Sequence, residues 1–396
     1  MAQPIPKKVK ESNPNAGVRY YNTLLIDGSN VLELSMRDET VSSNGKITGG
    51  IFQFLLQIRM MLQKGNFRYV YVFWDGDNSG ALRWAINSEY KANRDKNFEN
   101  SDAELSDYMK SVNEKIRQMQ NHIFDKNKTK HKDVVKEMSK KEHKDLFYWQ
   151  RDVIMECLEE LFVRQCVCNK TEADDFIGYY VANKEPNERV IIMSNDRDLT
   201  QLISDDVSVY IQSMKKFVTP KNHKELMGYD YRNVLLKKMI CGDQSDNIKG
   251  IKGVGETTLF RNFPKFINEK ITLEEVIDGA RKINEERILK KQKPLKWAEN
   301  IINSVTDGIQ GEKIYEINRR IIDLSEPLMT DEAKELIEAI MHAPLDPEGR
   351  SMENLYSVLL NYGIDQFRDE SHFANFFTQF DNLIKQEKKK SAGCTC

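Results

Sequence analysis

Acidic residues follow several separate apolar, strand-like runs in this chain, and this placement constrains its fold more than any other feature. The runs LLI, YVFW, CVC and VIIMS are each followed, at once or within a few residues, by aspartate or glutamate. The strand–helix–strand order of residues 20–77 predicts a mostly parallel α/β sheet. Because the carboxyl ends of parallel strands share the edge at which ligands bind, we expect the acids to converge on one crevice.

Nine carboxylates make up this expected acidic group. They are Asp27, Asp75, Glu172, Asp174, Asp175, Asp196, Asp198, Asp243 and Asp246. So many carboxylates repel one another unless protons or cations lie among them. Oxygen ligands without histidine or cysteine favour Mg²⁺ or Mn²⁺ over zinc. Two such ions about 4 Å apart can clamp the attacking and leaving oxygens of a phosphodiester.

Each acidic segment also has an ordinary explanation when taken alone. IDGSN can be a strand followed by a turn, EADD an acidic first helical turn capped by Thr171, and NDRD a solvated loop. GDQSDN places Asp243 and Asp246 three residues apart, so that they can share one side of a helical turn. The combination of these segments favours a metal-dependent phosphodiesterase.

A glycine-rich loop, GIKGVGET, spans residues 250–257. Its glycine spacing is that of a P-loop, but Glu256 stands where the phosphate-binding lysine belongs, and no strand precedes it. We interpret it as a helix–hairpin–helix loop whose backbone N–H groups bind a nucleic-acid phosphate; a plain interhelical turn is the alternative. The predicted contacts are Lys249, Gly250, Lys252, Gly253 and Gly255.

The amino-acid composition indicates the cellular location of the protein better than its function. The 396 residues allow two or three domains, and a formal net charge of −2 says little about partners. Six cysteines without a paired CxxC zinc pattern favour a reduced intracellular protein. We find no signal-peptide pattern and no apolar run near the roughly 20 residues of a membrane helix, so a cytoplasmic protein is expected.

Six segments occur in the order found in flap-endonuclease-type 5′ nucleases: LLIDGSN, VFWDGD, EYKANRD, TEADD, SNDRDLTQL and GDQSDNIKGIKGVGETT. The chain resembles this family over residues 20–262. Within the family it is similar to the phage 5′→3′ exonucleases and the phage ribonuclease H enzymes. The resemblance implies a PIN-like, Rossmann-like α/β fold with a helical arch and a C-terminal helical domain. It also implies cleavage at single-strand/duplex junctions near a 5′ end.

The resemblance assigns roles to individual residues. It places Asp27, Asp75, Glu172 and Asp174 at a first metal, Asp196, Asp198, Asp243 and Asp246 at a second, and Asp175 between them as a further catalytic group. Lys91 and Arg94, at the base of the arch, would polarise the scissile phosphate, unless they form a solvated helix face. Tyr90 would stack on a base, and Arg83 would assist in binding nucleic acid. The implied cofactors are two Mg²⁺ ions, with Mn²⁺ as a substitute, and K⁺ at the hairpin loop.

The expected organisation follows from these motifs. It comprises a disordered basic segment (1–19), a PIN-like nuclease domain (20–220) with the arch at about 80–150, a helical domain (221–385) with the hairpin motif at about 231–262, and a flexible tail (386–396). The basic stretches 281–296 and 388–390 either extend the duplex footprint or are solvated helix faces.

The expected activity is that of a 5′→3′ exonuclease and flap endonuclease that removes RNA primers in replication or repair. The substrates would be DNA and RNA/DNA duplexes with 5′ flaps or 5′ ends. The protein is expected to be a monomer, in the host cytoplasm if phage-encoded, and its partners would be a single-strand-binding protein or a replication clamp, with no membrane. The alternatives are a PIN-type ribonuclease and a catalytically silent, structure-specific nucleic-acid binder.

Overall fold

The computed structural model describes residues 20–43, 45–92, 138–306 and 314–391, and its centre is a six-stranded sheet. The sheet has the order β3-β2-β1-β4-β5-β6, with β1 (Tyr21–Asp27), β2 (Phe67–Trp74), β3 (Arg164–Val167), β4 (Glu188–Met193), β5 (Val207–Ile211) and β6 (Lys216–Val218). All pairings within this sheet are parallel except that of β5 with β6, which is antiparallel. The predicted mostly parallel α/β sheet is confirmed.

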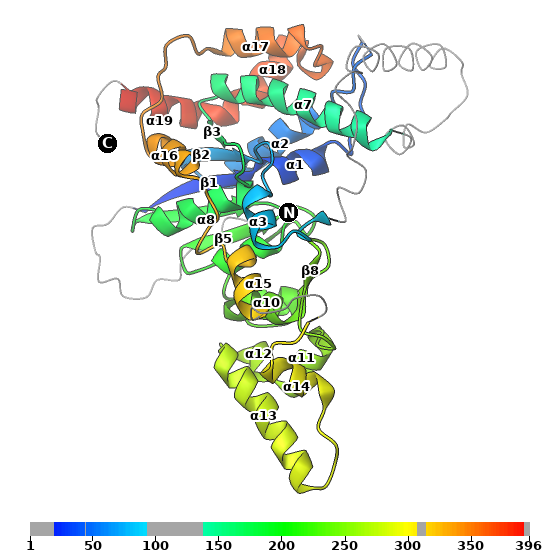
Figure 1. Cartoon of the computed structure of the whole chain (residues 1–396). Coiled ribbons are helices and arrows are strands. Elements are labelled where there is room, and N and C mark those ends of the chain that lie inside the picture. Colours follow the sequence, from blue (N-terminus) through cyan, green and yellow to red (C-terminus); the bar gives the residue numbers. More distant parts are fainter. Residues whose placement is uncertain (1–19, 44, 93–137, 307–313, 392–396) are drawn as a thin grey trace.

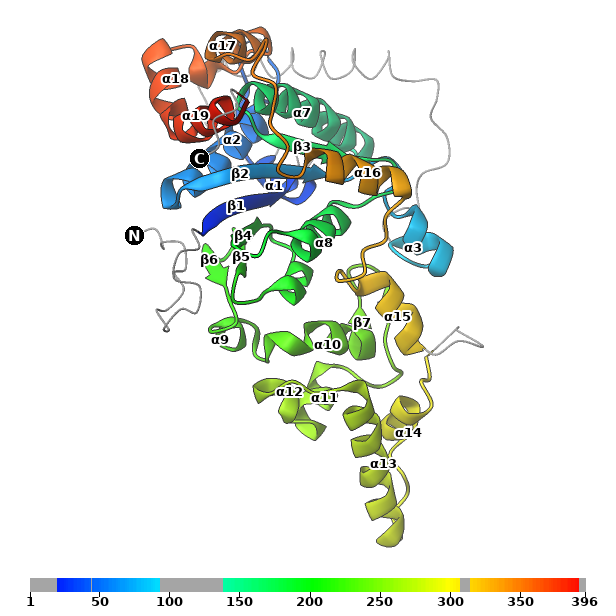
Figure 2. The same cartoon turned by 90° about the vertical axis from the view of Figure 1, so that its left-hand side faces the viewer.

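Both faces of the sheet are covered, which explains why its central strands are continuous apolar runs. In β1 the alternating side chains divide between two cores: Leu24 and Ile26 lie in one, and Leu25 lies in the other. Figure 2 shows α2, α7 and α17–α19 on one side of the sheet and α8 on the other. Since β1 pairs in parallel with both β2 and β4, the carboxyl ends of these three strands meet at one edge.

The helices of these two layers come from distant parts of the chain. The first layer contains α1 (Gly28–Ser35), α2 (Gly49–Lys64), α7 (Lys140–Glu160), α17 (Met352–Asn361), α18 (Glu370–Phe377) and α19 (Asp381–Ser391), with η4 (Asp365–Phe367) and η5 (Thr378–Phe380) between the last three. The second contains α8 (Ala173–Asn183) and α16 (Asp331–Ile340). Shorter elements are α3 (Ala81–Ile86), η2 (Asp198–Leu202) and α9 (His223–Met227).

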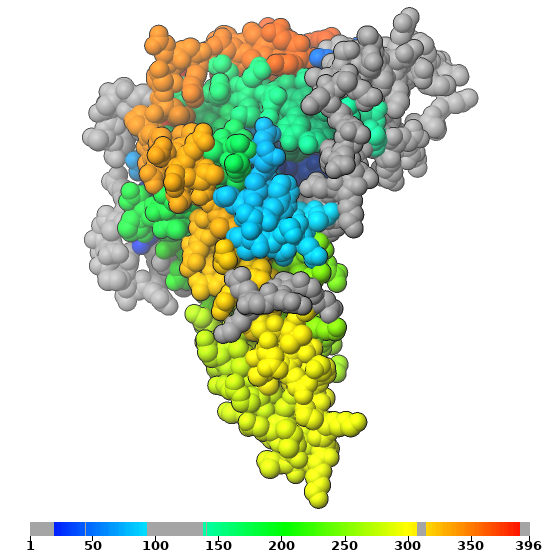
Figure 3. All heavy atoms as spheres, in the orientation of Figure 1, coloured from blue at the N-terminus to red at the C-terminus, as the bar shows by residue number. Residues whose placement is uncertain are grey.

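A separate helical module extends from the edge of the sheet that carries the acids. It has its own core and contains η3 (Tyr231–Asn233), α10 (Val234–Cys241), the two-stranded β7 (Gly242–Asp243) and β8 (Ile248–Lys249), α11 (Glu256–Asn262), α12 (Lys265–Asn268), α13 (Leu273–Leu289) and α14 (Lys296–Ile302). Figures 1 and 3 show it tapering away from the sheet domain. The next helix, α15 (Ile314–Ile322), returns along α10 and joins the module to the sheet domain.

The C-terminal helices correct the predicted domain boundaries. Residues 352–391 pack on the sheet, in the same core as β1 and β2, and do not belong to the helical module. The predicted flexible tail at 386–396 is also wrong for its first part, because α19 continues to Ser391. Glu387 in that helix is fully buried against Arg164 of β3, with two 2.9 Å hydrogen bonds. A pattern of apolar residues could show that these segments are helical, but not which core they join.

Several predictions lie outside the described residues. These are the disordered segment 1–19, most of the arch at 80–150, and the end of the tail after residue 391. Among the helices that the structure does describe, none combines the length and the apolar character needed to cross a membrane.

Candidate metal centre and nucleic-acid interface

The acids at the carboxyl edge of the sheet lie close enough to repel one another. Asp27 ends β1 and Asp75 follows β2, and burial together with the charge of Asp75 raises the pKa of Asp27 to about 7. Burial and repulsion, chiefly from Asp196 and Asp27, raise the pKa of Asp174 well above its ordinary value. Four strand ends therefore contribute to a first acidic group, which we define as Asp27, Asp75, Glu172, Asp174 and Asp196.

Hydrogen bonds of ordinary length orient these carboxylates. Asp27 accepts from the backbone N–H of Asn30 at 3.1 Å, as the N-cap of α1, and from the Ser194 hydroxyl at 2.8 Å. Asp75 accepts from the backbone N–H of Ala173 in the first turn of α8 at 2.9 Å. Thr171 therefore does not cap this helix as predicted: the N-cap is Glu172, and the Asp75 carboxylate takes the helical N–H.

A second acidic group lies where the sheet meets the helical module. One carboxylate oxygen each of Asp198, Asp243 and Asp246 lies within 4.8 Å of the others. Asp243 ends β7 and Asp246 lies in the turn between β7 and β8, so the two do not share the predicted helical turn. Burial and the neighbouring Asp196 raise the pKa of Asp198 to about 6, so Asp196 connects the two groups electrostatically.

Lys238 of α10 is a basic residue of this site that the sequence motifs did not identify. Its ammonium group bridges Asp198 and Asp243 and is 2.5 Å from the Asp243 carboxylate. Burial alone would raise the pKa of Asp243, but Lys238 and Ser245 lower it to about 2. The available signal was its position five residues before Asp243, in the helix that leads directly into the acidic segment.

Arg83 and Asp175 form a buried ion pair beside the first acidic group. Two nitrogens of the Arg83 guanidinium contact the two Asp175 oxygens at 2.6 and 2.9 Å, and Arg83 also lies 3.2 Å from Glu172. Asp175 also accepts from the backbone N–H of Leu328 at 3.0 Å. Asp175 is 0% exposed and Arg83 is 4% exposed. In this structure Asp175 and Arg83 are thus paired with each other, while the place of Asp175 between two metals and the role of Arg83 in binding nucleic acid stay predictions.

Tyr90 and Lys91 both bind Glu172 from the segment at the base of the predicted arch. The Tyr90 hydroxyl lies 3.1 Å from one Glu172 oxygen, and the Lys91 ammonium lies 2.8 Å from the other. Burial alone would raise the pKa of Glu172, but Arg83 and Lys91 lower it. Tyr90 is only 2% exposed and packs beside Ile248 of β8. Its stacking on a base stays a prediction. Arg94 lies outside the described residues.

The predicted hairpin loop connects α10 and β7–β8 to α11. Two of its three glycines are needed for different reasons. At Gly250 there is no space for a side chain, because a Cβ would lie 2.2 Å from the Cys241 carbonyl carbon, and Gly253 has a φ of +76°, which favours glycine. Gly255 borders open space and precedes α11, whose first turn has no side-chain cap. Lys249 pairs with Glu89 at 2.7 Å, which joins this loop to the base of the arch. Backbone N–H groups near Gly255 are thus accessible to a phosphate.

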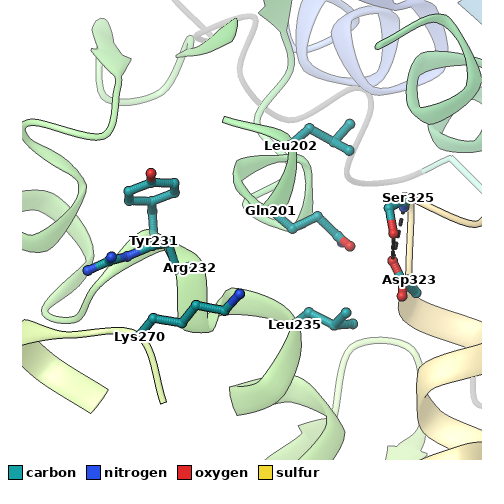
Figure 4. A pocket seen from close by; sticks show the side chains of 8 residues that line it. All are labelled: Gln201, Leu202, Tyr231, Arg232, Leu235, Lys270, Asp323 and Ser325. Atoms are coloured by element: carbon teal, nitrogen blue, oxygen red, sulfur yellow. Dashed lines mark hydrogen bonds between the residues drawn. The ribbon is translucent and has the colours of Figure 1, made fainter. Parts of the chain in front are cut away.

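A cleft of about 260 Å³ also lies between the sheet domain and the helical module (Figure 4). Its described lining is Gln201, Leu202, Tyr231, Arg232, Leu235, Lys270, Asp323 and Ser325, which includes none of the nine predicted acids. Asp323 and Ser325 form a hydrogen-bonded turn at one side, visible in Figure 4. The candidate metal centre therefore lies at the edge of the sheet and outside this cleft.

Comparison with known proteins identifies the family. Residues 22–148 and 123–228 match the model of the 5′-3′ exonuclease, N-terminal resolvase-like domain. The chain belongs to this family. It is similar to DNA polymerase I of Bacillus subtilis (29% identity; 40% of this chain, 19% of that protein) and to the 5′-3′ exonucleases of Buchnera aphidicola subsp. Schizaphis graminum (33%; 31% and 43%) and Mycoplasma pneumoniae (30%; 42% and 64%). The chain thus spans less than two thirds of the length of each of these relatives.

A solved structure supports the fold of nearly the whole chain. T5 5′-exonuclease with bound divalent zinc ions superposes with a TM-score of 0.52 over 91% of this chain and 100% of that chain, at 17% identity. A T5 flap endonuclease in a pseudo-enzyme–product complex with DNA and metal ions gives 0.51 over 91% of this chain and 99% of that chain, at 18% identity. The resemblance stated from the motifs is confirmed at the level of family and fold.

Proposed function

We propose that this chain is a metal-dependent, structure-specific 5′ nuclease. It would hydrolyse phosphodiesters in DNA or RNA/DNA duplexes at 5′ flaps and 5′ ends, as a 5′→3′ exonuclease, a flap endonuclease and a remover of RNA primers. The observation that carries the proposal is the pair of acidic groups at the carboxyl edge of the sheet, in a chain of the 5′-3′ exonuclease family.

The donor set fits two hard divalent cations. It consists of carboxylate oxygens, which suit Mg²⁺, with Mn²⁺ as a substitute. Asp27, Asp75, Glu172 and Asp174 would hold one ion, and Asp196, Asp198, Asp243 and Asp246 the other. Bound there, the ions would supply an activated water and stabilise the leaving oxygen. The raised pKa values of Asp27 and Asp174 support this assignment, because a nearby cation relieves the repulsion that raises them.

Groups of the protein itself would bind the phosphates of the substrate. Lys91, now paired with Glu172, would turn its ammonium group to a non-bridging oxygen of the scissile phosphate. Gly255 and the start of α11 would bind the duplex backbone without reading its sequence. We retain Arg94 in the arch and K⁺ at the hairpin loop on the strength of the family resemblance. A monomer, a single-strand-binding protein and a clamp remain predictions from the sequence.

The test is cleavage of a 5′-labelled flap duplex with Mg²⁺, beside an EDTA control and a 3′-flap duplex. We expect short labelled products from the 5′ flap only, lost with EDTA and in Asp174→Asn. The matched control is Asp77→Asn, which changes an exposed acid two residues past Asp75 and should leave cleavage intact. Binding of the flap without cleavage in either Mg²⁺ or Mn²⁺ would instead support the catalytically silent binder. An RNA-tipped 5′ strand then tests primer removal.

A further inference from the structure

The helical module ends in a projecting arm with a strongly basic end. The arm consists of α13, α14 and the connection between them, and Figures 1 and 3 show it pointing away from the sheet domain. We define its basic tip as residues 287–296. The tip contains Arg287, Lys290, Lys291, Lys293 and Lys296 and no acidic residue. Ile288 and Leu289, in the last turn of α13, are 58% and 83% exposed.

The arm is held in one shape by contacts on both of its limbs. A capping box of Thr272 and Glu275 begins α13, and Val276 and Ala280 are fully buried in the core of the module. Asn284 joins the limbs, because its side chain accepts from the backbone N–H of Leu295 at 2.7 Å. Since the arm is already ordered, a ligand at its tip would not have to order the limbs on binding.

The arm and the hairpin loop form one unit. The backbone N–H of Lys252 donates to the Val305 carbonyl at 2.9 Å, and the Asn300 side chain of α14 donates to the Lys252 carbonyl at 2.9 Å. Trp297, in the first turn of α14, lies next to Gly253. Leu295, two residues earlier, is level with Asn284 of α13. From Asn284 to Leu289, α13 extends a further five residues away from the hairpin loop, or about 7.5 Å. This length corresponds to roughly two phosphate spacings along one strand of a duplex.

Most of the tip's positive charge is not neutralised within the described part of the chain. Lys296 of the tip pairs with Glu299, and Arg281, below the tip, pairs with Asp278. Lys290, Lys291 and Lys293 are exposed and have no ion-pair partner among the described residues. Exposed apolar side chains among lysines are unfavourable for solubility alone, but they suit a nucleic-acid minor groove, which apolar side chains of bound proteins enter.

We propose that the basic tip is a second duplex-binding site that continues the grip of the hairpin loop along the same nucleic acid. Lys290, Lys291 and Lys293 bind backbone phosphates, and Leu289 packs against sugars in the minor groove. This inference rests on the proposed function. A convex end offers neither a groove nor a sheet edge, which many peptide-binding surfaces use, and this favours a duplex over an acidic peptide. The rigid link to the hairpin loop favours the same choice.

The test compares the full chain with Lys290→Gln/Lys291→Gln/Lys293→Gln by fluorescence anisotropy. The probe is a labelled 5′-flap duplex in EDTA, titrated at several salt concentrations. Losing three phosphate contacts lowers the slope of log affinity against log salt by about 2.7. From 50 to 200 mM salt the wild type should therefore lose roughly 40-fold more affinity than the variant. Leu289→Ser should weaken binding several-fold and leave the slope unchanged.

The matched control is Lys215→Gln/Lys221→Gln/Lys385→Gln, which neutralises three exposed lysines of the sheet domain and should keep the wild-type slope. An unchanged slope in the tip variant, with flap cleavage intact, would overturn the tip assignment while leaving the nuclease proposal standing. If the wild type did not cleave the flap while the tip variant still showed the lower salt slope, the nuclease proposal would fail and the tip assignment would stand. If the tip variant bound duplex normally but lost binding to an acidic, apolar peptide probe, the partner would be a protein and our assignment would be wrong.

Discussion

Replacing Asp27 with asparagine should stabilise the protein while abolishing its proposed activity. Asp27 is buried, and its pKa is raised from 3.8 to about 7 by burial and by Asp75. A raised carboxyl pKa means that the folded state prefers the protonated form. Its stability contribution is therefore fully present below pH 3.8 and is lost as the pH rises through 7. Asparagine is isosteric, remains neutral and is an equally good N-cap for α1.

The magnitude follows from the size of the shift. Raising the pKa of Asp27 from 3.8 to about 7 lowers the free energy of unfolding by about 4 kcal/mol at pH 8 and by about 2 kcal/mol at pH 5.5. Asp27→Asn should recover these amounts in the free energy of unfolding. The measurement is urea denaturation in EDTA at both pH values, followed by circular dichroism.

Three outcomes bear on this reasoning. Added Mg²⁺ should raise the stability of the wild type by mass action and should raise that of Asp27→Asn much less. The exposed control Asp77→Asn should change neither curve. A variant that is no more stable than wild type at pH 8, or a gain that does not shrink at pH 5.5, would show that Asp27 is not strained by its neighbours.

Three further predictions concern other contacts. Glu387→Gln should lower the free energy of unfolding by about 3–5 kcal/mol, because it leaves the buried Arg164 without its anion; a loss below about 1 kcal/mol in urea denaturation would contradict this. Lys238→Met should tighten Mg²⁺ binding about tenfold by calorimetry, since an ammonium no longer competes for Asp198, and weaker binding would refute the idea. Tyr90→Phe should cost about 1 kcal/mol of stability and leave flap affinity unchanged; weakened flap binding would instead support a role of the Tyr90 hydroxyl in binding nucleic acid.

The acidic edge was predictable because its information is local. Each buried strand is an apolar run, each run is followed by an acid, and parallel pairing brings strand ends together without any knowledge of side-chain contacts. The Arg83–Asp175 pair was not predictable in this way, since 92 residues separate the two and either could have faced the crevice. Sequence order placed Asp175 among the acids, but its side chain points to a different partner.

The same limit applies to Tyr90, Lys238 and the C-terminal helices. Tyr90 lies in a motif whose family role suggested exposure, but tertiary packing against Ile248 buries it. Lys238 sits in an ordinary helix and becomes part of the site only through the direction of one side chain. Helical periodicity in residues 352–391 identified the helices, but the choice between two cores depends on shape complementarity that the pattern does not encode.

The docking of α17–α19 has a consequence for how the protein is made. Phe367, Phe376 and Phe377 are buried in the same core as β1, β2, α2 and α7, so the helical layer on this face of the sheet stays incomplete until these late residues leave the ribosome. A nascent chain would carry every acid of the centre and still lack a finished sheet domain. The proposed activity would therefore arise only after nearly the whole chain has been translated. A fragment that ends at residue 228, where the family match ends, should aggregate rather than cut.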